Sequence, residues 1–443
     1  MSFVDTIIAL SSGRLPAGLA VVRASGPHAR FAIETIAGKL PKPRVAAYRA
    51  LKRRDGTLLD NGLALFFPAP NSFTGEDVVE FHVHGGRAVV TALLDELAAI
   101  PGMRHAEPGE FTRRAFLNGR LDLTETEALA DLINAETEAQ RRFAVRNVAG
   151  AQSALYLGWR QRLIHARAMI EADIDFSDEE DVPGSVADAV WVDVRSIMTE
   201  IAGHIEGFRA AEIIRGGFDV VILGAPNSGK SSLFNALVKR DAAIVTSEAG
   251  TTRDLLEIAL DIKGVLVRVT DTAGIRSDAG MVETIGIERA RARAGEADLV
   301  LVLEDMQTPI HFDLGEVTAP CLKIGTKNDL VRAGYLRGLD KTYDIEISTA
   351  DGLGIAALLD EVGRRASDEI SRAGDVLPSR MRHVELLGET VRYLGEAADS
   401  GGSPLELRSE ALRLAAHSLG RIAGSVDVED LLDVIFSQFC IGK

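Results

Sequence analysis

The chain has 443 residues, of which 46% are hydrophobic and 26% charged, with a formal net charge of −16. The composition is ordinary for a globular protein, the length predicts two to four domains, and the negative charge argues against a broad electrostatic grip on nucleic acid. Two cysteines are too few for a disulfide framework and favour a reducing compartment. We see neither a signal peptide nor an apolar run of the roughly 18 residues that a membrane helix needs, so we expect a cytoplasmic protein without a membrane contact.

Residues 1–118 alternate short strand-like runs, such as LAVVRA and DVVEFHV, with turns that contain glycine and proline. A strand at VEFHVH would place Glu80, His82 and His84 on one face. Such a face could bind zinc, but a complete site needs further ligands that are not evident in the sequence. We therefore favour a strand that leads into a helix at HGGRAVV.

Residues 119–213 have a helical pattern. Apolar residues at three- and four-residue spacing predict one long amphipathic helix over 121–150, which 155–176 continues. The acidic segment 175–184 lacks the spacing and glycine of a calcium-binding loop, so we interpret it as a solvated turn. Six arginines are candidates for a local nucleic-acid patch, but we favour solvated helix faces. They are Arg113, Arg114, Arg120, Arg141, Arg142 and Arg146.

From residue 218 the pattern changes to α/β, and after about 368 the helical pattern returns. The economical interpretation is an α/β domain over 214–368, inserted into a helical domain formed by 119–213 and 369–443. Such an insertion is tolerated when the ends of the inserted domain lie close together. Within the α/β segment, Cys321 falls in a strand and is expected in the core.

A phosphate-binding motif follows the first strand of this segment. GAPNSGKS (224–231) fits G-x-x-x-x-G-K-[ST] between a buried strand and a helix. Gly224 and Gly229 let the backbone approach phosphate, and successive N–H groups form an anion nest. We expect Lys230 to reach the β- and γ-phosphates and Ser231 to ligate Mg²⁺.

Three further motifs follow in the order found in GTPases. GTTRD supplies Thr252 as a second Mg²⁺ contact. In DTAG, Asp271 can hold Mg²⁺ through water and the Gly274 N–H can sense the γ-phosphate. In TKND, Asp329 can accept two hydrogen bonds from guanine that adenine cannot donate. EISTADG (346–352) lies where a base-cradling loop is expected, so GTP is favoured over ATP.

Two positions depart from the usual GTPase pattern. Thr326 replaces the asparagine that begins the base-reading motif, so we expect weaker base binding with guanine selectivity retained. Ile275 stands where Ras-like proteins have the glutamine that orients the attacking water, and it cannot replace that glutamine. Glu283 is a nearby carboxylate that could orient the water, or it could be a helix-start residue. Arg253 and Arg276, or a bound monovalent cation, could neutralise the developing charge.

The chain resembles the MnmE (TrmE) family of tRNA-modification GTPases over essentially its whole length. The resemblance rests on the motifs above and on NSFTGEDVVEFHVHGG, PGEFTRRAFLNGRLDLTETEALADLI, VETIGIERA and the terminal FCIGK. The resemblance implies a multidomain α/β and α protein with a folate-binding-like α+β domain at 1–118. It also implies an all-α helical domain and a Ras-like P-loop GTPase domain. It further implies a homodimer through the N-terminal domains and a heterotetramer with the flavoprotein MnmG (GidA). Together they would install an aminomethyl-type group on C5 of the wobble uridine of certain tRNAs.

The resemblance also implies cofactors and residue roles. Hydrolysis of GTP would be potassium-stimulated, with Asn227, Thr246, Glu248 and Thr251 around K⁺ and Glu283 as the catalytic glutamate. The one-carbon unit would come from a tetrahydrofolate derivative, 5-formyl or 5,10-methylene. The matching folate residues are Arg23, Glu80, Arg120 and Lys443, with arginine at 120 where lysine is common.

The motifs and the resemblance together predict a set of GTP contacts. They are Gly224, Asn227, Ser228, Gly229, Lys230, Ser231, Ser232, Thr246, Ser247, Glu248, Ala249, Gly250, Thr251, Thr252, Asp271, Thr272, Ala273, Gly274, Thr326, Lys327, Asp329, Ser348, Thr349 and Ala350. An alternative function is a regulatory or ribosome-assembly GTPase whose flanking domains are interaction modules.

The terminal FCIGK places Cys440 four positions from the last residue, Lys443. Lipidation is disfavoured because Gly442 and Lys443 suit a prenylation motif poorly, and no second cysteine lies nearby for a redox pair. The apolar run 431–439 predicts a final helix docked on the core, which would order the tail. Cys440 is then either a catalytic thiol or inert packing.

Overall fold

The computed structural model describes residues 3–175, 185–240, 243–244, 256–271, 291–310, 312–315, 317–331, 343–371, 374, 376–399, 403–426, 432, 435–436, 439 and 442. The chain forms two compact units. One unit contains Met1–Ala130, Val148–Phe176 and Leu405–Lys443, and the other contains Asp131–Asn147 and Ser177–Pro404.

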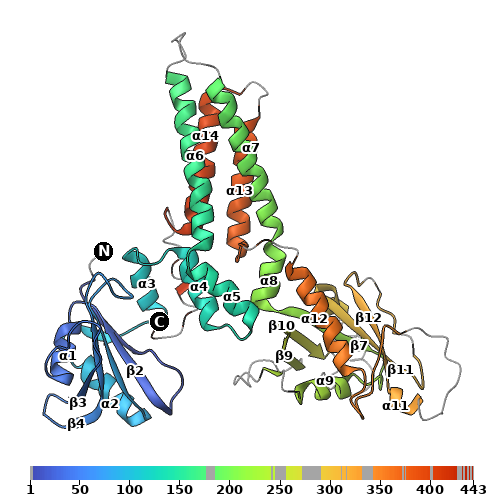
Figure 1. The fold of residues 1–443 in the computed structure, drawn as a ribbon, viewed down its shortest axis with the longest axis horizontal. Helices are drawn as coiled ribbons and strands as arrows, with labels where there is room; N and C mark the ends of the chain where they lie inside the picture. The colour runs from blue at the N-terminus through green and yellow to red at the C-terminus, as the bar shows by residue number, and fades with distance from the viewer. Residues whose placement is uncertain are drawn as a thin grey trace. The chain divides into compact units, whose positions relative to one another are not determined.

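The N-terminal part is a six-stranded sheet with flanking helices (Figure 1). Its strands are β1 (Thr6–Leu10), β2 (Ala17–Ser25), β3 (Ala47–Lys52), β4 (Leu58–Phe67), β5 (Val78–Gly85) and β6 (Met103–His105). Its helices are α1 (Ala29–Ala37), α2 (Arg87–Ala98) and α3 (Glu110–Leu117). The order is β3-β4-β5-β2-β1-β6, and β1 and β6 are parallel while the other neighbours are antiparallel.

One face of this sheet carries the larger apolar core, against which α1 and α2 pack. Val79, Phe81 and Val83 of β5 are at most 2% exposed in that core. Because side chains alternate along a strand, Glu80, His82 and His84 lie on the opposite face, which confirms the prediction. The helix predicted at HGGRAVV is α2, which begins at Arg87.

The prediction of a single long helix over 121–150 is wrong. The segment forms α4 (Leu123–Ile133) and α5 (Glu138–Val148), and α6 (Ala151–Asp175) follows. Before α5, the Gln140 Oε1 atom accepts hydrogen bonds from the backbone N–H groups of Glu136 and Thr137 at 2.8 and 3.1 Å. Before α6, Gly150 has φ +84°, which a helix interior does not adopt. Local capping therefore overrides the continuous apolar spacing.

The remaining helices pack in pairs (Figure 1). They are α7 (Ser185–Glu206), α8 (Phe208–Gly216), α12 (Ile355–Ser371), α13 (Met381–Ala398) and α14 (Leu405–Ala423). Helix α6 lies along α14, and α7 lies along α13. Helices that precede the α/β segment thus pair with helices that follow it, as the predicted insertion requires. None of the described helices has the length and apolar character needed to cross a membrane.

The α/β segment contains a seven-stranded sheet. Its elements are β7 (Phe218–Gly224), α9 (Lys230–Val238), β8 (Ala243–Ile244), β9 (Leu256–Ile262), β10 (Val265–Asp271), β11 (Leu299–Asp305), β12 (Cys321–Thr326), α11 (Asn328–Leu330) and β13 (Ile345–Glu346). The order is β13-β12-β11-β7-β10-β9-β8, with β7, β10, β11, β12 and β13 parallel. Cys321 is half-buried at the start of β12, beside the core residues Val221 and Val300. The predicted fold class is confirmed.

Asp131 joins the two connections that bracket this sheet. Arg215, at the end of α8, donates from Nε to both Asp131 oxygens at 3.2 and 3.1 Å. Arg380, just before α13, donates to the same oxygens at 3.0 and 2.9 Å. The Arg215 Nη1 atom also donates to the Ser379 carbonyl at 2.7 Å. The chain therefore leaves the inserted segment close to where it entered.

Candidate nucleotide and one-carbon sites

The phosphate loop connects β7 to α9 through a tight turn. Gly224 has φ +154°, and a Cβ atom there would lie 2.4 Å from the Leu303 carbonyl oxygen, so only glycine fits. Asn227 and Gly229 also have positive φ, at 63° and 96°. These left-handed residues turn the backbone so that its N–H groups gather at the start of α9, where an anion is favoured.

Lys230 lies folded over this loop. Its Nζ atom donates to the carbonyl oxygens of Gly224 and Ala225 at 2.8 and 2.9 Å. Burial lowers the pKa of Lys230, and the nearby Asp271 opposes that shift. Asp271 is fully buried at the end of β10, the strand beside β7. A phosphate group could replace the two carbonyls as the partner of Lys230.

The serines of the loop differ in burial. Ser228 is 2% exposed, and its Oγ atom has no hydrogen-bond partner among the described residues. Ser231 and Ser232 are exposed at the start of α9. The loop therefore has one buried hydroxyl, on Ser228, and two exposed hydroxyls at the start of α9.

Thr326 connects the base-reading motif to the phosphate loop. It is 3% exposed, and its hydroxyl lies 2.8 Å from the Ser228 carbonyl oxygen and 3.2 Å from that of Glu304. The shorter contact is to the loop itself. The short side chain at this position thus holds β12 against the loop.

The residues after Thr326 form the other side of this edge of the sheet. Lys327 has φ +60°, and its Nζ atom lies 2.6 Å from Asp305 Oδ2. Burial alone would raise the pKa of Asp305, but hydrogen bonds from Lys327 and the Gln307 N–H hold it below its usual value. Asp329 is half-buried in α11. These groups follow parallel strands at their carboxyl ends, where α/β sheets bind ligands.

The predicted base-cradling loop is closed by its own hydrogen bonds. Ser348 is fully buried, its N–H donates to the Leu353 carbonyl at 2.9 Å, and its Oγ accepts from the Asp351 N–H at 3.4 Å. Thr349 and Ala350 are exposed at the tip of the loop.

Several predicted residues lie outside the described part of the chain. They are Thr246, Ser247, Glu248, Ala249, Gly250, Thr251, Thr252, Arg253, Thr272, Ala273, Gly274, Ile275, Arg276, Glu283, Cys440 and Lys443.

A second polar site lies on the N-terminal sheet, on the face opposite α1 and α2. Arg23 of β2 stands directly across from Glu80 of β5, and its Nε and Nη2 atoms donate to Glu80 Oε1 at 3.0 and 2.9 Å. The Arg23 guanidinium also lies 5.6 and 5.8 Å from the ring centres of Phe73 and Phe111. An ion pair beside two aromatic rings suits a flat polar ligand.

The predicted folate residues come together here in part. Arg120 is exposed and lies beside Gly75, two residues after Phe73. Gly442 lies beside the end of β1, because the Ser11 hydroxyl donates to its carbonyl oxygen at 2.8 Å. Ser11 is in turn bonded through its N–H to the Val21 carbonyl, two residues before Arg23. Gly442 therefore lies near the strand that carries Arg23.

Three described residues of the segment 431–439 are buried, in agreement with the predicted docking of that segment. Leu432, Phe436 and Phe439 are 4%, 2% and 7% exposed, and they form a cluster with Leu123. The Phe436 ring lies 6.4 Å from that of Phe116.

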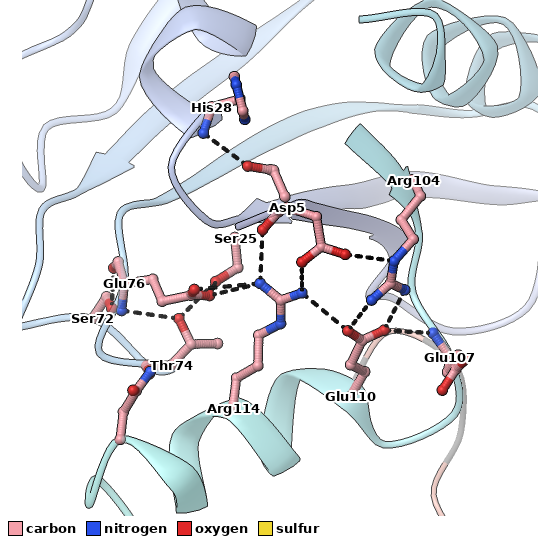
Figure 2. Close-up of polar contacts among 12 residues, drawn as sticks. Asp5, Ser25, His28, Ser72, Thr74, Glu76, Arg104, Glu107, Glu110 and Arg114 are labelled. Atoms are coloured by element: carbon pink, nitrogen blue, oxygen red, sulfur yellow. Dashed lines mark hydrogen bonds and ion pairs between the residues drawn. The ribbon is translucent and has the colours of Figure 1, made fainter. Parts of the chain in front are cut away.

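Arg114 forms a buried charge cluster that the sequence analysis missed. It is 1% exposed, and Figure 2 shows its guanidinium among three carboxylates. It donates to Asp5 Oδ1 at 2.8 Å, to Glu110 Oε1 at 3.0 Å and to Glu76 at 3.3 Å. Arg104 pairs with Asp5 and Glu110 as well. The cluster holds β1, α3, β6 and the loop before β5 together.

The prediction that the six arginines lie on solvated helix faces is therefore wrong for Arg114, which is buried. Arg120, Arg141, Arg142 and Arg146 are exposed and Arg113 is half-buried. One signal could have identified the buried pair, because Glu110 and Arg114 are four residues apart on one helix. Charge spacing alone does not show which face of a helix is covered.

The two histidines of the Glu-x-His-x-His face contact carboxylates of the same sheet. His82 Nε2 lies 3.2 Å from Glu80 Oε2, and His84 Nδ1 lies 2.9 Å from Asp60 Oδ1. Within the described ranges, no group of three or more His, Cys, Asp or Glu side chains is placed to hold a metal ion.

Comparisons with known families and proteins cover nearly the whole chain. Residues 6–120 match the GTP-binding protein TrmE N-terminus, and residues 123–440 match the MnmE helical domain. A protein named tRNA modification GTPase MnmE, from Mesorhizobium japonicum, is 66% identical over 439 residues, which cover 99% of each chain. One of the same name from Brucella anthropi is 55% identical over 442 residues, which cover 100% of this chain and 99% of that one. The chain belongs to the MnmE family.

MnmE-family membership rests on these full-length matches, and not on solved structures. The G domain of FeoB from T. maritima is 23% identical over 34% of this chain and 98% of that chain, with a TM-score of 0.24. Aquifex aeolicus Era bound to GDP and AlF₄⁻ is 19% identical over 40% of this chain and 66% of that chain, with a TM-score of 0.25.

Proposed function

We propose that the chain hydrolyses GTP in the modification of tRNA. The phosphate loop between β7 and α9 carries the proposal, because the positions of Lys230 and of the left-handed loop residues suit the phosphates of a nucleotide. The family supplies the context, since the relatives are named tRNA modification GTPases. The proposal includes a cytoplasmic location. It also includes the domain boundaries 1–118, 119–213, 214–368 and 369–443.

In the nucleotide site, Lys230 would release the two loop carbonyls and contact the β- and γ-phosphates. Ser231 and Thr252 would hold Mg²⁺, which neutralises charge on the phosphates, and the buried Asp271 would act through water. The left-handed backbone and the exposed Ser231 hydroxyl fit this role.

Asp329 would give guanine selectivity. Its carboxylate would accept hydrogen bonds from the N1–H and amino group of guanine. An Asp329→Asn chain should therefore favour xanthosine triphosphate over GTP in competition binding. Retained preference for GTP would remove this role from Asp329.

Glu283 would orient the attacking water, because Ile275 cannot. Asn227, Thr246, Glu248 and Thr251 would surround K⁺, which supplies positive charge near the phosphates. The exposed Asn227 side chain, on a left-handed residue of the loop, suits this contact. Hydrolysis should be faster in K⁺ than in Na⁺, and equal rates would remove the cation role.

The N-terminal sheet would hold a tetrahydrofolate derivative, 5-formyl or 5,10-methylene. This proposal is supported by the Arg23–Glu80 pair beside two aromatic rings, by the exposed Arg120 and by Gly442 beside Ser11. Lys443 and Cys440 would complete the site. The folate would supply a one-carbon unit for an aminomethyl-type group on C5 of the wobble uridine. This chain would form a homodimer, and the homodimer would form a heterotetramer with the flavoprotein MnmG that carries out the reaction.

Nucleoside analysis of tRNA after gene deletion tests the function. Loss of the aminomethyl-type modification is expected. Normal wobble uridines would instead favour a regulatory or ribosome-assembly GTPase. Complementation with Cys440→Ser should restore GTP hydrolysis but not modification, and full modification would make Cys440 structural.

A further inference from the structure

His82 extends the Arg23–Glu80 pair into a row of three side chains. Along β5 it follows Glu80 by two residues and therefore lies on the same face of the sheet. The side chains of Arg23, Glu80 and His82 are 22%, 16% and 22% exposed, so all three are largely shielded from water.

The two oxygens of Glu80 are divided between its neighbours. Oε1 accepts both Arg23 donors at 3.0 and 2.9 Å, and Oε2 lies 3.2 Å from His82 Nε2. In the tautomer that carries the hydrogen on Nε2, His82 donates to this carboxylate oxygen. The carboxylate is thereby held from both sides, and its rotation about the last bond is restricted.

Glu80 still has acceptor capacity in this arrangement. A carboxylate offers about four lone-pair positions, and the described donors on Glu80 are the two of Arg23 and the one of His82. An N–H group of a flat ligand could therefore bind Glu80 without displacing either neighbour.

We propose that His82 is a positioning residue of the one-carbon site, which fixes Glu80 so that it faces the N–H donors of a bound folate. This inference rests on the proposed function. It adds a residue to the four that the family resemblance implies for the site.

His84 provides a matched control on the same strand. It is 73% exposed, and its ring and backbone N–H contact Asp60 at 2.9 and 2.8 Å instead of Glu80. A substitution at His84 changes the strand in the same way but leaves Glu80 untouched.

Equilibrium binding of 5-formyltetrahydrofolate to the full chain tests the role of His82. His82→Leu should weaken binding about tenfold, since a hydrogen bond to a charged group contributes about 1.5 kcal/mol. His82→Gln keeps an N–H donor and should restore binding to within about threefold of the unmodified chain, as expected for a retained hydrogen bond. His84→Leu should bind like the unmodified chain.

The outcomes separate the inference from the proposed function. Equal binding by His82→Leu and the unmodified chain, with binding lost in Glu80→Gln, would overturn the role of His82 alone. Equal weakening in His82→Leu and His82→Gln would show a packing role and also overturn it. Absence of folate binding by the unmodified chain would overturn the proposed one-carbon function itself.

Discussion

At the level of single residues, Thr326 links the end of β12 to the phosphate loop. Its hydroxyl lies 2.8 Å from the Ser228 carbonyl oxygen in a buried setting. Thr326→Val removes this buried donor, which costs about 1 to 2 kcal/mol. We expect GDP affinity to fall about five- to thirtyfold in fluorescent-nucleotide titrations. Thr326→Ser keeps the hydroxyl and should bind nearly normally, so equal losses in both variants would contradict this role.

The Arg114 cluster predicts how the stability of the N-terminal sheet depends on pH. Burial alone would raise the pKa values of Asp5 and Glu110, but hydrogen bonds from Arg104 and Arg114 hold them below the ordinary 3.8 and 4.5. Groups with lowered folded pKa values stabilise the fold above their unfolded values, and this stabilisation is lost as pH falls through the folded values. The thermal midpoint should therefore be flat above about pH 5 and fall below it.

Glu110→Gln should reduce the acid-side slope of that profile, because it removes one of the groups that must take up a proton. Differential scanning calorimetry from pH 7 to pH 3 would measure both proteins. An identical slope in the variant would show that Glu110 does not contribute.

At the level of elements, the C-terminal tail depends on a close backbone contact. Gly442 has φ +100°, and a Cβ atom there would lie 2.1 Å from the Leu10 carbonyl oxygen. Gly442→Ala should displace the tail from β1, expose it to carboxypeptidase and abolish tRNA modification while GTP hydrolysis continues. Gly13→Ala is the control, because nothing lies within 4 Å of its Cβ position. Normal modification by Gly442→Ala would show that tail placement is not required.

Elements with strong local signals were predictable from the sequence. The strand, loop and helix of the phosphate site appear as β7 and α9, because a buried apolar run and the glycine spacing leave few alternatives. The breaks before α5 and α6 were not predicted, since the Gln140 cap and one left-handed glycine act against the apolar spacing. The cluster around Arg114 depends on residues from distant segments, and spacing along one helix does not show them.

At the level of the whole molecule, the proposal assigns separable tasks to two sites. Lys230→Ala should lower GTP hydrolysis at least about a hundredfold, as loss of a charge-stabilising donor does. Glu80→Gln should leave hydrolysis intact but abolish modification. Steady-state phosphate release from both purified variants would measure this. Loss of hydrolysis in Glu80→Gln would contradict separate sites.

The central claim is that one chain couples a GTPase site to one-carbon transfer on tRNA. Mass spectrometry of wobble nucleosides in a deletion strain, complemented with the unmodified chain, Lys230→Ala or Glu80→Gln, tests it most directly. We predict that the aminomethyl-type nucleoside is missing from the deletion strain and returns only with the unmodified chain. Its presence in the deletion strain, or its full return with either variant, would contradict the account.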